Sequence, residues 1–165
     1  MVQYLSNPLI SNTTLNIPYP YAKKDAEHWL KMNHFDPAKK LPHTFVLEWK
    51  RTKKMIGAMG LHPTDEHNRA EIGYWVAVPY WNKGVATEAL NAVMEYGFYQ
   101  HGYHKLLATH MMDNMASGRV MIKAGMKKEG KLKDHYKKNG RYKSILMYAL
   151  TRADFDKMKK PKLSE

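Results

Sequence analysis

The residues from Ala70 to Val78 divide into two alternating sets of side chains, as on the two faces of a β-strand. Most of them are β-branched or aromatic, and such side chains fit an extended backbone. We expect the strand to stop before Pro79, because proline has no backbone N–H to donate. One face would carry Ile72, Tyr74, Val76 and Val78, and the other Gly73, Trp75 and Ala77.

The spacing of the apolar residues changes after this strand. From Ala86 to Gly97 they recur every three or four positions, which predicts a helix. The turn before the helix contains Lys83 and Gly84. A helix start has unpaired backbone N–H groups and the positive end of the helix dipole, so this turn is a candidate site for a phosphate or diphosphate group. In the alternative interpretation the glycine only turns the chain between two packed elements.

The same patterns predict the remaining elements. A strand, a helix and a further strand in succession indicate a parallel pair within a mixed sheet, and hence a mixed α/β fold. We expect a short helical piece over Met1–Leu9, a loop over Ser11–Tyr21, helices over Lys24–Met32, Asn114–Gly125 and Thr151–Met158, strands over Thr44–Lys50, Met55–Leu61 and Leu106–Met111, and a hairpin with arms Lys127–Tyr136 and Arg141–Leu150 around Asn139-Gly140.

The composition is that of one folded domain spanning 1–165, with a basic tail over about 159–165. Of its 165 residues, 44% are hydrophobic and 25% charged, which excludes a disordered chain. Neither a membrane-spanning apolar run nor a signal-peptide pattern is present, so we expect a cytoplasmic protein without a membrane partner. The absence of cysteine excludes disulfides, thiolate nucleophiles and cysteine metal sites. The nine histidines show no metal-binding spacing, and we expect no metal.

The net charge of +12 is the most unusual feature of the composition, and about half of the lysines and arginines lie from Lys123 onward. Such a surface favours polyanionic partners: a phosphorylated cofactor, an acidic substrate or the ribosome. A solvated lysine-rich surface without a partner is the other interpretation.

Two stretches resemble a known family. The segment Trp81-x-Lys-Gly-x-Ala-Thr-Glu-Ala, after a strand reading Ala-Glu-Ile-Gly-Tyr-Trp, resembles motif A of the GNAT acyltransferases in their RimJ/RimL-type, protein N-terminal acetyltransferase branch. The segment NMASGRVMIKAG from Asn114 resembles motif B. Gly118 stands where that motif usually has a branched aliphatic residue, and should loosen the helix by up to ~1 kcal/mol. Met126 replaces the usual phenylalanine.

The resemblance implies the GNAT fold, a central mixed and mostly antiparallel sheet flanked by helices. Family members usually begin with a strand before their first helices, and nothing precedes Met1 here. We therefore expect the sheet to lack that first strand, or Met1 to be internal to a longer natural chain.

The resemblance also implies acetyl-CoA as the acyl donor and assigns residues to its parts. We expect Asn114 and Ser117 to line the pantetheine arm, and Ser117 to donate a hydrogen bond to the sulfur or its proton source. The backbone of Val76, Ala77 and Val78 would pair with the pantetheine, and one of its N–H groups would bind the oxyanion. The diphosphate would be held by Asn82, Lys83, Gly84, Val85, Ala86 and Thr87.

The acceptor side has several candidate residues. Glu71 is the leading candidate for the general base, with water, His135 or Tyr136 as alternative bases. In a purely structural interpretation, Glu71 is an exposed strand carboxylate that pairs with Arg69 or a lysine. Proposed contacts to the acceptor are Tyr19 and Tyr21, in a loop stiffened by two prolines, together with Trp75 and Tyr136. The two loop tyrosines are equally compatible with packing over the core.

Without cysteine, the acetyl group would pass directly from thioester to amine, or through another nucleophile. The resemblance favours a protein N-terminal α-amine, such as that of a ribosomal protein. A small-molecule amine is the alternative, although the positive surface disfavours a polycation. A non-catalytic basic module that binds RNA or the ribosome is a third interpretation. Monomer and homodimer both stay open.

Overall fold

The computed structural model describes residues 1–33 and 43–159, and it places six strands in one sheet with helices around them. Except for Lys159, the expected basic tail lies outside this part of the chain. The strands are β1 (Thr44–Trp49), β2 (Lys54–Thr64), β3 (Arg69–Val76), β4 (Lys105–Met111), β5 (Lys127–Lys138) and β6 (Arg141–Thr151). The helices are α1 (Val2–Leu5), α2 (Pro8–Thr13), α3 (Lys23–Met32), α4 (Val85–Tyr99), α5 (Met115–Lys123) and α6 (Arg152–Lys159), with 3-10 turns η2 (Asp65–His67) and η3 (Val78–Tyr80).

The sheet has the order β1-β2-β3-β4-β6-β5, and β3 with β4 is its parallel pair. This confirms the predicted mixed, mostly antiparallel sheet. The parallel pairing ends at Glu71 with Leu107. Beyond that point β3 still pairs with β2 as far as Val76, and β4 pairs with β6 as far as Met111. The two central strands therefore separate toward their carboxyl ends while each keeps its outer neighbour.

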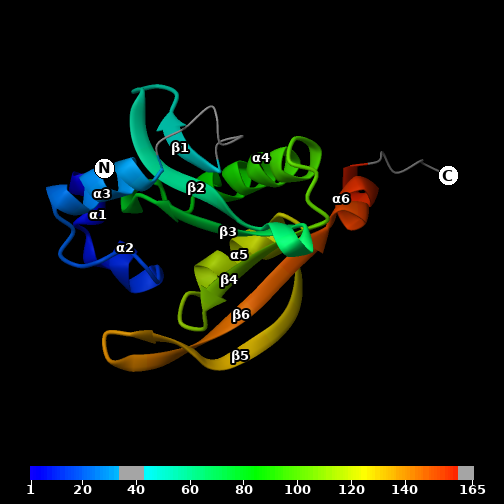
Figure 1. Ribbon diagram of the computed structural model, residues 1–165. Helices are drawn as coiled ribbons and strands as arrows, with labels where there is room; N and C mark the ends of the chain where they lie inside the picture. Colours follow the sequence, from blue (N-terminus) through cyan, green and yellow to red (C-terminus); the bar gives the residue numbers. More distant parts are fainter. Residues whose placement is uncertain (34–42, 160–165) are drawn as a thin grey trace.

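Two apolar clusters cover the two faces of the sheet. On one face α4, α5 and α6 bury Leu90, Met121 and Phe155 against strand residues that include Ile72. The second cluster joins α1–α3 to Trp75 on the other face of β3. These positions confirm the alternation predicted for the strand. The expected end at Val78 is wrong: β3 ends at Val76, and Val78 begins the turn η3 and packs with the second cluster instead of on the face of Ile72. Figure 1 shows α1, α2 and α3 gathered at one end of the sheet, with the tip of the β5–β6 hairpin at the same end and α6 at the opposite end.

Several element boundaries differ from the prediction. The predicted loop from Ser11 loses its first three residues to α2, whose start is capped by the side chain of Asn7, which accepts a hydrogen bond from the Leu9 N–H. Strand β2 runs past Leu61 to Thr64 and includes Pro63. Proline is tolerated there because β1 pairs only as far as Gly60, so this end of β2 has a partner on one side only.

Candidate active site

A cleft of about 1270 Å³ opens where β3 and β4 separate. It is lined by α1–α3, strands β2, β3 and β4, the turn that leads into α4, one side of α5 and the β5–β6 hairpin. Most of the residues predicted to bind donor or acceptor meet there, although they come from distant parts of the sequence. Those that line the cleft are Tyr21, Glu71, Trp75, Val76, Asn82, Gly84, Val85, Ala86, Thr87, Asn114, Ser117 and Tyr136.

Four of the predicted site residues do not line this cleft. Tyr19 is 58% exposed and borders a separate hollow of about 300 Å³ beside the hairpin tip. The ammonium of Lys83 lies over the ring of Tyr80, 5.6 Å from its centroid. Ala77 is buried, and Val78 begins the 3-10 turn η3.

The turn before α4 has the geometry of an anion site. Gly84 is the N-cap of α4 and has φ +80, while Asn82 has φ 59, so both lie in the left-handed region that suits glycine and asparagine. In the described part of the chain, the backbone N–H groups of residues 82–87 have no hydrogen-bond acceptor. Together with the positive end of the α4 dipole, these groups can bind a phosphate or diphosphate.

The backbone of residues 76–78 is largely occupied within the protein. The Trp81 indole donates to the Val76 carbonyl at 2.6 Å, and the Ala77 N–H donates to the Ile56 carbonyl at 2.7 Å. The Ala77 and Val78 carbonyls accept hydrogen bonds within η3. The N–H of Val78 has no acceptor among the described residues, but Val78 does not line the cleft. Bonding to β2 alternates along the strand and Ala77 donates to Ile56, so the N–H of Val76 points away from β2, toward the gap that β4 leaves.

Glu71 is the last residue of β3 that pairs with β4, next to the point where these two strands separate. The hydroxyl of Thr109, on β4, donates a hydrogen bond of 2.8 Å to its Oε1 and so bridges the two strands. No lysine or arginine of the described ranges forms an ion pair with Glu71. The interpretation of Glu71 as a structural carboxylate paired with Arg69 or a lysine is therefore not supported. Glu71 faces the cleft, and the Thr109 hydroxyl orients one of its oxygens.

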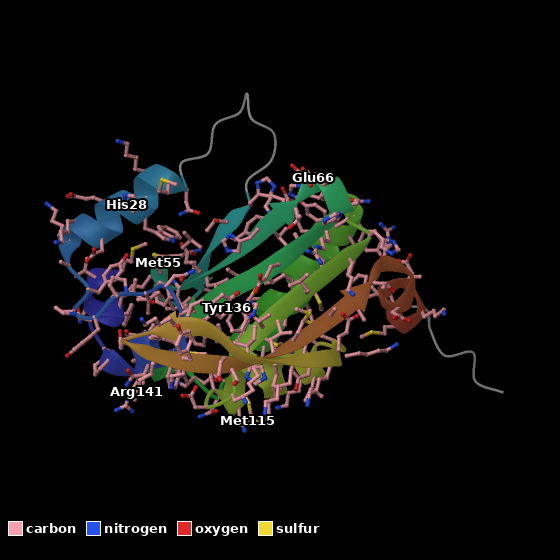
Figure 2. The ribbon with its side chains drawn as sticks, turned by 60° about the horizontal axis from the view of Figure 1, so that its bottom comes forward. His28, Met55, Glu66, Met115, Tyr136 and Arg141 are labelled. Atoms are coloured by element: carbon pink, nitrogen blue, oxygen red, sulfur yellow. The ribbon has the colours of Figure 1, made fainter. Side chains whose placement is uncertain are left out.

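Tyr136 faces the same cleft from the hairpin. A bulge between Leu132 and Tyr136 interrupts the pairing of β5 with β6, and the Ser144 hydroxyl holds it by accepting a hydrogen bond of 3.0 Å from the Asp134 N–H. Burial, with the nearby charge of Glu71, raises the pKa of Tyr136, so this residue stays protonated and can donate a hydrogen bond at neutral pH. Figure 2 shows Tyr136 where the hairpin crosses the central strands, away from the tip near Arg141.

Two further predicted residues lie at the start of α5. The Asn114 side chain caps the helix by accepting from the Ser117 N–H at 3.3 Å, and it donates to the Thr13 carbonyl of α2 at 2.9 Å. Asn114 therefore connects α5 to the N-terminal helices. The Ser117 hydroxyl lies 2.6 Å from the hydroxyl of Tyr74 on β3. Burial raises the pKa of Tyr74 to about 12, an effect that the hydrogen bond between Tyr74 and Ser117 partly offsets.

Sequence reasoning missed several residues of the cleft. Arg119 and Lys123 line it from α5, four residues apart and therefore on one helix face. That spacing was visible in the sequence, and it marks a basic side wall. Thr109 and His110 line the cleft from β4, and no local pattern distinguishes them from ordinary strand residues.

The comparison with known proteins assigns the family. Residues 1–127 match the family model described as an acetyltransferase (GNAT) domain. The chain belongs to the GNAT acetyltransferase family. The predicted resemblance is thereby confirmed. Among the residues that the structure describes, no helix is both long and apolar enough to cross a bilayer, and no group of three potential ligands could hold a metal ion.

Two curated relatives of this GNAT protein illustrate its similarity at the sequence level. The uncharacterized N-acetyltransferase YoaA of Bacillus subtilis (strain 168) is 36% identical over 107 residues, which are 64% of this chain and 60% of YoaA. The match thus spans less than two thirds of that relative. The ribosomal protein uS5-alanine N-acetyltransferase of Escherichia coli (strain K12) is 31% identical over 84 residues, 51% of this chain and 43% of that enzyme.

Solved structures show the same fold. RimJ of Mycobacterium smegmatis, in complex with CoA-disulfide, matches with a TM-score of 0.80 at 20% identity, covering 96% of this chain and 77% of RimJ. The spermidine N-acetyltransferase of Vibrio cholerae, in complex with CoA and spermine, matches with a TM-score of 0.75 at 22% identity, covering 93% of this chain and 89% of that enzyme. At these identities the likeness concerns the fold alone.

Proposed function

We propose that this GNAT protein transfers the acetyl group of acetyl-CoA directly to a primary amine, and that the acceptor is a protein N-terminal α-amine. The observation that carries the proposal is the turn of residues 82–87. Its unoccupied N–H groups lie at the start of α4 and line the cleft between the separated strands β3 and β4. The family uses an acetyl thioester as donor, and this turn offers the donor's diphosphate a site of matching charge.

The remaining donor contacts follow from this placement. With the diphosphate at the turn, the pantetheine arm would enter the gap between β3 and β4, toward which the Val76 N–H points. Ser117 would then lie near the thioester sulfur. Arg119 and Lys123 supply positive charge on the α5 side of the same cleft, which suits a phosphorylated donor.

The acceptor would approach from the other side of β3. Glu71 takes the proton that the attacking amine must lose, with its carboxylate oriented by the Thr109 hydroxyl. The aromatic side chains of Tyr21, Trp75 and Tyr136 border the cleft and would exclude water around the reacting amine. A backbone donor such as the Val76 N–H would stabilise the negative charge that develops on the carbonyl oxygen.

The charge of the molecule favours a protein N-terminus over a polyamine. A polyamine carries several positive charges, and the net charge of this chain is +12. In the described residues, Asp25 and Glu71 are the acidic side chains that line the cleft. A single α-amine needs fewer acidic partners. The basic surface also fits substrates presented on the ribosome, where RNA supplies negative charge.

The proposal is tested in two steps on the purified chain. Calorimetry with acetyl-CoA measures donor binding, and thiol release in the presence of peptide N-termini or of spermidine then measures transfer. We expect binding, and faster release with peptides than with spermidine. Faster thiol release with spermidine would overturn the proposal that the acceptor is a protein N-terminus. Salt-sensitive RNA binding without acetyl-CoA binding would overturn the proposal that the protein is an acetyltransferase.

A further inference from the structure

A pair of hydroxyl groups on the cleft wall has a geometry that simple packing does not require. The hydroxyls of Tyr74 and Ser117 lie 2.6 Å apart, joining β3 to α5 across 43 positions of the sequence. Both residues line the cleft. The Tyr74 ring packs into the apolar cluster beneath α4 and α5, so its hydroxyl is held in place by the ring.

The direction of this hydrogen bond follows from a second contact. The Tyr74 hydroxyl also lies 3.4 Å from the backbone carbonyl oxygen of Ser117, which can only accept. Tyr74 as the donor satisfies both contacts, because its proton then lies between two oxygens of Ser117. The Ser117 hydroxyl proton is left without an acceptor in this pair, and it can be donated to a group in the cleft.

The two sides of β3 divide the chemistry of the site. Successive side chains of a strand point to opposite faces, so Glu71 and Tyr74 lie on opposite sides of β3. Glu71 contacts Thr109, whereas Tyr74 contacts Ser117. An amine could thus lose its proton on one face while the thiol departs on the other.

We propose that Tyr74 is a positioning residue, which fixes Ser117 as the hydrogen-bond donor to the departing sulfur. The inference rests on the proposed function, because it requires a thioester donor in the cleft. As the carbon–sulfur bond breaks, its electron pair goes to sulfur, and the Ser117 hydroxyl donates a hydrogen bond to the forming thiolate while Tyr74 donates one to the Ser117 oxygen. Both hydroxyls keep their protons. Glu71 passes the amine proton to water and the released thiolate takes a proton from water, so the transfer needs no further reactant.

The high pKa of Tyr74 agrees with this role. A buried tyrosine whose pKa is about 12 remains protonated throughout the neutral range, so it is a permanent donor. Serine alone is a weak acid, and an oriented donor behind it keeps its proton directed into the cleft instead of toward other acceptors.

The test compares Tyr74→Phe, Ser117→Ala and the double variant, with Tyr103→Phe as the matched control. Tyr103 is a buried tyrosine of the same core; its hydroxyl contacts His43, and it does not line the cleft. We expect Tyr74→Phe to lower kcat about tenfold, since it removes one hydrogen bond that matters in the transition state. Acetyl-CoA binding and KM should change little, and Tyr103→Phe should leave kcat as it is.

The double variant separates positioning from structure. If Tyr74 acts through Ser117, Tyr74→Phe causes no further loss of kcat in the Ser117→Ala background. An equal loss in both backgrounds, or an unchanged kcat of Tyr74→Phe alone, would overturn the inference and leave the proposed function in place. Binding of acetyl-CoA without thiol release from the wild type would instead overturn both.

Discussion

The imidazole of His110, on β4, fills the space beside Gly118 of α5. A Cβ atom on Gly118 would lie 2.6 Å from Nε2 of His110, closer than such atoms can approach. The ring is 4% exposed, and its Nδ1 donates to the Met111 carbonyl at 2.9 Å, so it is held in this position. The glycine that departs from motif B is therefore explained: the histidine occupies the volume that a branched aliphatic side chain would take.

This contact predicts an unusual response to Gly118→Ala. Alanine is favoured over glycine in a helix by about 1 kcal/mol, but the added methyl group overpacks the site against His110 at a cost of about 1–3 kcal/mol. We expect a net loss in the free energy of unfolding, measured with urea. In a His110→Ala background the same substitution should become stabilising. A stabilising Gly118→Ala in the wild-type background would contradict this explanation.

The turn before α4 can be tested with a pair of matched glycines. Gly84 and Gly102 have φ +80 and +73, and neither would place a Cβ within 4 Å of another atom. Each alanine substitution should therefore cost about the same stability, roughly 1 kcal/mol, from the left-handed backbone alone. Only at Gly84 would the methyl group enter the proposed diphosphate site.

Calorimetry distinguishes the two variants. We expect Gly84→Ala to weaken acetyl-CoA binding by tenfold or more, about 1.4 kcal/mol, while Gly102→Ala binds as the wild type does. Equal binding by both variants would place the diphosphate elsewhere than at this turn.

Local sequence patterns predicted some parts of the site, whereas contacts between distant residues became visible only in the fold. The strand at Ala70 and the turn at Gly84 were predictable because their signals, side-chain alternation and a glycine before a helix, lie within a few residues. The contact of Glu71 with Thr109 joins residues 38 positions apart, and it depends on where two strands separate. Periodicity predicts that a residue faces a given side, but not which residue of another strand it meets. The contact of the His110 ring with Gly118 could not be predicted from the sequence for the same reason.

The role of Glu71 as the base predicts a graded series of variants. Glu71→Gln keeps the shape of the side chain but cannot accept the amine proton, and we expect kcat to fall by roughly 10²–10⁴-fold. Thr109→Val leaves the carboxylate in place without its 2.8 Å hydrogen bond, and should cause a smaller loss. Neither variant should change acetyl-CoA binding.

The matched control for this series is Glu66→Gln. Glu66 is an exposed carboxylate in the 3-10 turn η2 and does not line the cleft; Figure 2 shows it apart from Tyr136. The Glu66→Gln variant should have the same kcat as the wild type. Full activity in Glu71→Gln would transfer the role of base to water or to Tyr136.

Lys138 connects the hairpin tip to the N-terminal helices. Its ammonium donates to the backbone carbonyls of Ser11, in the last turn of α2, and of Thr14, the C-cap of this helix. Lys138→Met keeps the length of the side chain but removes the donor. Because α2 and the hairpin both border the cleft, we expect faster amide exchange in α2 and a higher KM for the acceptor, with acetyl-CoA binding unchanged. Lys137→Met is the control, since the Lys137 ammonium lies over the Tyr142 ring instead, 5.8 Å from its centroid. If both variants exchange at the wild-type rate, the contact with Ser11 and Thr14 does not hold α2 against the hairpin.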